Sequence, residues 1–301
     1  MTAVAAPSKL SFKNILFLTD FAEPSEAALP FAMEIAREFG AKIHAMNLMI
    51  PAAYTYTTPE LTAVAIAAQE ETAIAEMKKV DAQLAGLPHE VIVERATEIW
   101  GPVREALEEN RIDLVVLGTS GRTGAQRLLL GSVAEEIFRR SPVPVLTIGP
   151  GVRRNAAGTA QLSRVLVATD FSPEAEAAVP FALLLASREN GRLVLLHVAP
   201  KPRGDASTDS SRAVFSAAET LHRLHGLVGD QAELKAAPEV LIDYGDPAER
   251  IVEAARQRQA GLIVLGIRRP TGVPGAATHL ERPVAHKIVV HAPCPVLAIR
   301  R

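Results

Sequence analysis

The chain has 301 residues, 48% of them hydrophobic and 22% charged, with a formal net charge of −2. This balance is ordinary for a globular protein and lacks the basic excess that nucleic-acid binding requires. A single cysteine, Cys294, excludes an internal disulfide framework, which is typical of a reducing, cytoplasmic compartment. We find no apolar run near the roughly 18 residues of a membrane span, and residues 1–12 do not resemble a signal peptide.

The first half predicts alternating strands and helices. Strands are expected at Ile15–Thr19, Lys42–Met49, Glu90–Arg95, Leu114–Gly118 and Val143–Gly149, and helices at Pro24–Phe39, Pro59–Ala85, Trp100–Glu109 and Ser132–Arg140. The second helix is indicated by apolar residues that recur close to a 3.6-residue period, at Leu61, Val64, Ala65, Ala68, Ile74, Met77, Val80 and Leu84. The strands are Val/Ile/Leu runs without polar alternation, as buried parallel strands are.

The second half repeats the first at an offset of 150 residues. NILFLTDFAEPSEAALPFAMEIA begins at Asn14, and RVLVATDFSPEAEAAVPFALLLA begins at Arg164. Strands are expected at Val165–Thr169, Arg192–Val198, Glu239–Asp243, Leu262–Gly266 and Val296–Ile299. We therefore predict two tandem α/β domains with doubly wound parallel sheets, at residues 1–150 and 164–301, joined by a linker at 151–163.

A glycine-rich segment follows the fourth strand, where such sheets bind ligands. Gly118, Gly121, Gly131 and Ser132 form G-x2-G-x9-G-S, and Arg122 and Arg127 add positive charge. Glycines let backbone N–H groups approach phosphate oxygens, and a helix that starts after Gly131 directs further N–H groups at an anion. No G-x-G-x-x-G follows the first strand, which argues against an ordinary dinucleotide-binding domain.

Asp20 after the first strand, the glycine loop and the closing Pro-Val-Pro-Val-Leu resemble the universal stress protein family, over nearly the whole chain and twice. The resemblance implies five-stranded sheets of order 3-2-1-4-5, an adenine nucleotide alpha hydrolase-like fold. It implies ATP, with or without Mg²⁺, bound by the first domain. Asp20 and Leu48 would contact the adenosine end, and the phosphates would contact Gly118, Gly121, Arg122, Gly131, Ser132 and the amide of Val133. It also implies edge-to-edge pairing of the last strands, Val143–Ile148 and Val296–Ile299, in an internal pseudo-dimer, and leaves a homodimer open.

The second domain departs from this pattern. Asp170 and Gly266 are kept, but Arg269 stands at the second glycine position and Arg282-Pro283 replace Gly131-Ser132. Proline has no amide hydrogen, so we expect little or no ATP binding there. Arg268, Arg269 and Arg282 leave another anion open as an alternative.

Structural roles compete with these assignments. Ser132 and Glu135 form S-x-x-E, a capping box, and Asp20 and Asp170 could cap the helices that follow them. The histidines and Cys294 lack the paired spacing of a zinc site, so no metal is predicted.

No catalytic residue is assigned either. The leading function is a nucleotide-binding stress-response regulator. The alternatives are a slow ATPase or autokinase, with Thr119, Ser120 and Thr123 as phosphate acceptors, and an interaction module with a vestigial site.

Overall fold

The computed structural model describes residues 11–50, 58–119, 130–152, 162–188, 191–201, 210–229, 234–268 and 284–300, apart from the side chains of residues 59 and 210–216. It divides into two compact units at the boundary between Pro150 and Gly151. We call them the first half and the second half, and describe each by itself.

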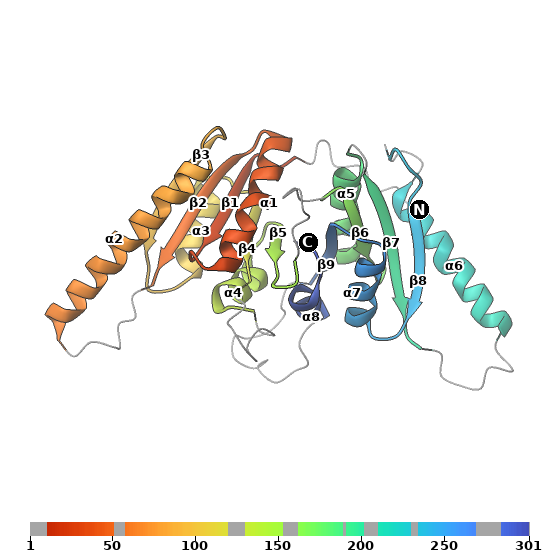
Figure 1. Ribbon diagram of the computed structural model, residues 1–301. Helices are drawn as coiled ribbons and strands as arrows, with labels where there is room; N and C mark the ends of the chain where they lie inside the picture. Colours follow the sequence, from red (N-terminus) through yellow and green to blue (C-terminus); the bar gives the residue numbers. More distant parts are fainter. Residues whose placement is uncertain are drawn as a thin grey trace. The chain divides into compact units, whose positions relative to one another are not determined.

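The first half alternates strands and helices along the chain (Figure 1). Its elements are β1 (Asn14–Thr19), α1 (Glu23–Phe39), β2 (Lys42–Met49), α2 (Pro59–Gln83), β3 (His89–Arg95), α3 (Trp100–Glu109), β4 (Leu114–Gly118), α4 (Ser132–Arg140) and β5 (Val145–Ile148). The strand order is β3-β2-β1-β4-β5, and all four pairings are parallel. This order is the one implied by the resemblance.

The second half repeats the same plan. Its elements are β6 (Arg164–Ala168), α5 (Pro173–Ala186), β7 (Arg192–Ala199), α6 (Ser210–Val228), β8 (Glu239–Tyr244), α7 (Pro247–Gln257), β9 (Leu262–Ile267), α8 (Val284–His291) and β10 (Val296–Arg300). The order β8-β7-β6-β9-β10, again wholly parallel, matches the first half strand for strand. The predicted fold class is confirmed for both halves.

The central strands are buried because helices cover both faces of each sheet. In β1, Ile15, Leu16 and Phe17 are at most 1% exposed, and Val165, Leu166 and Val167 of β6 are equally buried. This burial explains why the strands read as continuous apolar runs rather than as alternating ones. Aromatic residues are only 4% of the chain, so the cores consist mainly of Val, Ile, Leu and Ala.

Two predicted elements of the first half have an end that differs from the structure by two residues. The strand expected at Val143–Gly149 is shorter, Val145–Ile148, and begins directly after Pro144, whose carbonyl accepts a hydrogen bond from the Val115 amide (2.9 Å). The helix expected to reach Ala85 ends at Gln83, and Gly86, at φ +89°, lies in the turn that follows. A positive φ of this size favours glycine, which explains the residue chosen there.

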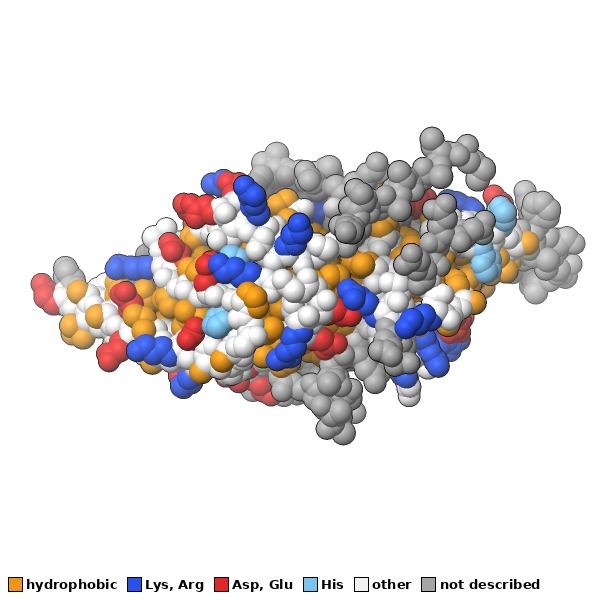
Figure 2. Space-filling model, turned by 90° about the horizontal axis from the view of Figure 1, so that it is seen from above, with side chains coloured by type: hydrophobic (Ala, Val, Ile, Leu, Met, Phe, Trp, Pro, Cys, Tyr) orange, Lys and Arg blue, Asp and Glu red, His pale blue; other side chains and the backbone are white. Residues whose placement is uncertain are grey.

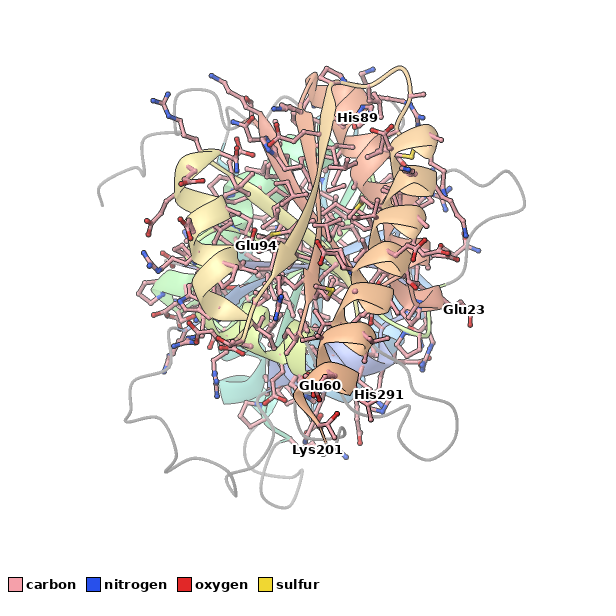
Figure 3. All side chains as sticks on the ribbon, turned by 90° about the vertical axis from the view of Figure 1, so that its left-hand side faces the viewer. Glu23, Glu60, His89, Glu94, Lys201 and His291 are labelled. Atoms are coloured by element: carbon pink, nitrogen blue, oxygen red, sulfur yellow. The ribbon has the colours of Figure 1, made fainter. Side chains whose placement is uncertain are left out.

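The apolar residues of α2 are buried only in the later part of the helix. Leu61 and Val64 are 53% and 67% exposed, whereas Met77 and Leu84 are 2% and 0% exposed. In Figure 3, α2 runs beside β3 from the end near His89 to the end near Glu60. Hydrophobic and acidic side chains alternate on the surface at the left-hand end of Figure 2, where α2 lies. Only the later turns of α2 therefore contribute to the core.

None of the helices in the described ranges has both the length and the apolar character needed to cross a membrane.

Candidate functional site

The candidate site lies at the carboxyl ends of β1 and β4. Strand β1 pairs with β2 on one side and with β4 on the other, so the chain order reverses between β1 and β4. In open parallel sheets, ligands bind outside the carboxyl ends of the strands at such a reversal. The turn after β1 and the end of β4 therefore border the site.

The turn after β1 has an unusual backbone conformation, and the second half repeats it. Phe21 has a φ of +60° and Phe171 a φ of +59°. This left-handed conformation costs a non-glycine residue about 1–2 kcal/mol. Two hydrogen bonds hold the first turn: the Phe21 amide donates to Thr19 Oγ1 (3.0 Å) and the Ala22 amide donates to Asp20 Oδ1 (3.1 Å). The recurrence of Thr-Asp-Phe therefore has a structural reason in both halves.

Asp20 stabilises the turn but is not the N-cap of α1. The N-cap is Ala22, which offers no capping side chain, so the sequence-based alternative was wrong on this point. Asp20 Oδ1 also accepts a hydrogen bond from the hydroxyl of Ser25, a buried residue in the first turn of α1. The Asp20 amide faces the same hydroxyl oxygen at 3.5 Å. Asp20 itself is exposed, so its carboxylate is accessible from solvent.

A buried amide, Asn47, links β2 to the same turn and was missed in the sequence. Its Nδ2 donates to the Thr19 carbonyl oxygen (2.8 Å), and the residue is 6% exposed. The signal that could have revealed it is a polar residue inside the apolar run of β2. The neighbouring Leu48, predicted at the adenosine end, is half-buried near the end of the strand.

Gly118 lies at the end of β4, against the start of α1. A Cβ atom at this position would lie 2.2 Å from the Pro24 carbonyl oxygen and 2.6 Å from the Ser25 amide nitrogen. Gly266 repeats this arrangement in the second half, where a Cβ would lie 2.0 Å from the Glu174 carbonyl oxygen. Close packing of a strand end on a helix start therefore requires glycine at both positions, independently of any ligand.

The segment after β4 is described only at its two ends. Thr119 is buried, and both its amide (2.9 Å) and its hydroxyl (3.3 Å) donate to the Ile148 carbonyl oxygen. These bonds engage its hydroxyl within the fold, which argues against the expected role of Thr119 as a phosphate acceptor. Gly121 and Arg122, predicted to hold phosphates, lie outside the described residues, as do Ser120, Thr123 and Arg127.

The start of α4 receives no cap from its own N-cap residue. That residue is Gly131, which has no side chain to accept a hydrogen bond. The capping box was therefore wrong: Ser132 is the first helical residue, not the cap, and the Glu135 amide donates to the Gly131 carbonyl (2.8 Å) as in any α-helix. The first N–H groups of a helix have no acceptor within it, and the helix dipole favours an anion there. Ser132 is exposed and Val133 is half-buried.

At its other end, α4 contacts the start of α3. The guanidinium of Arg140 lies 5.4 Å from the ring centroid of Trp100 and also donates to Glu136 (2.6 Å). This cation–π contact joins the last residue of α4 to the first residue of α3.

The second half keeps the turn but changes the side chains around it. The Ser172 amide donates to Asp170 Oδ1 (2.9 Å), and Ser172 caps α5 through its bond from the Ala175 amide (3.3 Å). Burial alone would raise the pKa of Asp170. Hydrogen bonds from Ser172 and the charge of Arg268 outweigh it and hold that pKa below its usual value.

Aromatic and basic groups cover the turn of the second half. The Phe171 ring lies 4.8 Å from the ring of His197 and 3.9 Å from the guanidinium of Arg223. His197 occupies the position of Asn47 and hydrogen-bonds the equivalent carbonyl, of Thr169 (2.8 Å). Arg268, proposed for an alternative anion, already pairs with Glu174 (3.6 Å). Arg269, Arg282 and Pro283 lie outside the described residues.

The structure thus brings two of the predicted site residues together. Asp20 and Gly118 both contact Ser25, one through a hydrogen bond and the other through close packing. Gly131, Ser132 and Val133 lie in sequence at the start of α4. Across the described ranges, no group of three or more His, Cys, Asp or Glu side chains is arranged to hold a metal ion.

Comparison with known proteins agrees with the fold. The family model described as the universal stress protein family matches residues 11–149 and 162–300. Universal stress protein MJ0531 of Methanocaldococcus jannaschii is 30% identical over 144 residues, which cover 46% of this chain and 82% of that protein. Universal stress protein Rv2005c of Mycobacterium tuberculosis is 29% identical over 235 residues, 76% of both chains.

A solved structure matches both halves at once. The crystal structure of a universal stress protein from Archaeoglobus fulgidus DSM 4304 has a TM-score of 0.64 and 21% identity, covering 96% of this chain and 98% of that one. The fold is of the adenine nucleotide alpha hydrolase type. Because one family model matches both halves in succession, the chain belongs to the universal stress protein family, with two copies of the domain in tandem.

Proposed function

We propose that the chain is a stress-response regulatory protein that binds an adenine nucleotide, ATP, in its first half. The observation that carries the proposal is the start of α4, where Gly131 supplies no capping side chain and the first-turn amides have no acceptor within the helix. Helices α2, α5 and α7 begin with the capping side chains of Thr58, Ser172 and Asp246, whereas α1 and α3, like α4, begin without one. The α4 start is therefore suited to hold phosphate oxygens.

The two ends of the nucleotide would contact different elements. Phosphates would accept hydrogen bonds from the amides of Ser132 and Val133, with Gly121 and Arg122 as further contacts. Asp20 and Leu48, at the ends of β1 and β2, would face the adenosine. A bound Mg²⁺ would neutralise part of the phosphate charge, and its ligands would come mainly from the phosphates themselves and water.

We propose that the second half does not bind ATP. Its sequence has Pro283, without an amide hydrogen, at the position of Ser132. Its turn is covered by Arg223 and His197, which contact Phe171, and its Arg268 is paired with Glu174. The proposal therefore expects one ATP per chain.

The proposal also covers assembly and compartment. The two halves would pair through the edges formed by β5 and β10 as an internal pseudo-dimer, and the protein would act in the cytoplasm. The lone cysteine, Cys294, is buried, and burial raises the pKa of its thiol to about 12. A thiol that stays protonated at neutral pH is poorly reactive, which supports a structural role for it.

The first prediction tests the amides at the start of α4 with two variants of one residue. Ser132→Ala removes the hydroxyl but keeps the amide hydrogen, whereas Ser132→Pro removes both. Proline is tolerated at the first helical position, and the backbone of Gly131 (φ −62°, ψ 153°) suits a residue before proline. We expect calorimetry with the full chain to give one ATP site, weakened at least about tenfold by Ser132→Pro and much less by Ser132→Ala.

The outcomes separate the possibilities. Two sites per chain would contradict the assignment to the first half. No heat from wild-type protein with ATP, ADP or AMP would remove the proposed function. Equal losses in the two variants would assign the contribution to the hydroxyl rather than to the amide.

A further inference from the structure

We infer that Ser25 is the positioning residue for the Asp20 carboxylate and thereby a determinant of nucleoside binding in the first half. The inference rests on the proposed function, because it concerns the residue that would face the adenosine. Ser25 lies outside the Thr-Asp-Phe motif and the glycine loop.

Asp20 and Ser25 face each other through two pairs of atoms. The Ser25 hydroxyl donates to Asp20 Oδ1, and the Asp20 amide faces the Ser25 hydroxyl oxygen at 3.5 Å. The Ala22 amide donates to the same Oδ1 (3.1 Å). Oδ1 therefore has two donors, while Oδ2 receives no hydrogen bond from any residue in the described part of the chain. The carboxylate is held by one oxygen and presents the other.

Ser25 is held more firmly by the fold than the Asp20 side chain to which it donates. Ser25 is 5% exposed and lies in the first turn of α1, directly where Gly118 packs on the helix. Asp20 is exposed, and without this bond the Ala22 amide would be the one hydrogen-bond donor to its side chain among the described residues. Fixing a side chain before the ligand arrives lowers the entropy that binding must overcome. The serine therefore pre-organises the carboxylate.

The second half lacks this anchor. Ala175, which is 4% exposed, occupies the position of Ser25, and Asp170 is held instead by Ser172, a half-buried residue at the N-cap of α5. The two halves therefore differ at the nucleoside end as well as at the glycine loop. Ala175 also shows that alanine fits this buried position with the helix start intact.

The chemistry of the carboxylate limits the ligand groups that Asp20 could contact. An ionised carboxylate only accepts hydrogen bonds, so Oδ2 must meet a donor. A ribose hydroxyl and the exocyclic amine of adenine are the donors that the nucleoside offers. An analogue that lacks the donor in question would lose the contact, and would then be insensitive to the removal of Ser25.

The test is a double-mutant cycle on the full chain, read by calorimetry with ATP. We expect Ser25→Ala to weaken binding by about three- to tenfold, a loss equal to the net contribution of one ordinary hydrogen bond. In the Asp20→Ala background, the same change should alter affinity by less than about twofold, because the group it positions is absent. Ala175→Ser in the second half is the matched control and should leave ATP affinity unchanged.

A second readout separates positioning from a merely structural role. Titrations with 2′-deoxy-ATP, 3′-deoxy-ATP and inosine triphosphate should identify one analogue that binds wild type and Ser25→Ala equally. An unchanged affinity in Ser25→Ala, or the same loss in both backgrounds, would overturn the inference while ATP binding itself stood. A wild-type chain that binds no nucleotide would instead remove the proposed function.

Discussion

Gly118 and Gly266 hold equivalent places, yet only one of them precedes an intact glycine loop. In both, a Cβ would lie 2.2 Å or less from a helix carbonyl oxygen, that of Pro24 or of Glu174. A packing requirement of this kind persists whether or not a ligand binds. This packing requirement explains why the second half keeps Gly266, although Arg269 and Arg282 stand at the positions of Gly121 and Gly131.

Replacing either glycine is predicted to destabilise its half. Gly118→Ala and Gly266→Ala should each lower the free energy of unfolding by about 3 kcal/mol, because the strand end and helix start must move apart. Gly226→Ala is the control, since no atom lies within 4 Å of a Cβ there and the residue is inside α6. It should be neutral or stabilising by up to about 1 kcal/mol in urea unfolding. A Gly118→Ala variant as stable as wild type would contradict the packing role.

The sequence allowed a role to be predicted only for residues that belong to a recognisable motif. Thr-Asp-Phe was recognised by its recurrence, but its reason, a left-handed Phe21 held by Thr19 and Asp20, is a matter of backbone geometry. Ser132 was given a capping alternative because the S-x-x-E spacing fits, whereas the helix begins at Ser132 itself, one residue earlier than that box requires. Ser25 could not be identified, because no pattern links it to Asp20 before the turn is folded.

At the scale of elements, every strand and helix predicted from the sequence is present in the structure. The sequence did not show how much of α2 packs on the sheet. The 25 residues of α2 extend about 37 Å, while the 7 residues of its neighbour β3 extend about 23 Å. The helix is therefore longer than the strand it accompanies. Hydrophobic periodicity reports which face is apolar, but not whether a sheet lies beneath it.

The unsupported turns of α2 should open more readily than the rest of the helix. We expect hydrogen exchange to show low protection for the amides of residues 63–71, where no side chain is buried, and higher protection for residues 77–83, near Met77 and Val80. Leu61→Ser should accordingly change stability by less than about 0.5 kcal/mol, whereas Met77→Ala should cost about 2–4 kcal/mol. Uniform protection along α2 would show that its first turns are covered in solution.

At the scale of the whole molecule, duplication has left two similar folds with different sites. If ATP binds only the first half, it should stabilise that half alone. At a free concentration of 100 times the Kd, the gain is about 2.7 kcal/mol. In thermal unfolding, we expect ATP to raise the transition of the first half and to leave that of the second half where it is.

Ser132→Pro supplies the control for this experiment, because it should remove the shift without removing either transition. A shift of both transitions by equal amounts would mean either that both halves bind or that they unfold as one cooperative unit. The second case is recognised by a single transition that Gly118→Ala and Gly266→Ala lower equally.

The contact of Arg140 with Trp100 has a practical consequence. Trp100 is the one tryptophan of the chain, and it lies in the first half. Its ring centroid is 5.4 Å from the guanidinium of Arg140, the last residue of α4. The opposite end of α4 is the candidate phosphate site. Tryptophan fluorescence therefore reports on the first copy of the duplicated domain, because the second copy contains no tryptophan. No label is needed to follow the response of the first copy by itself.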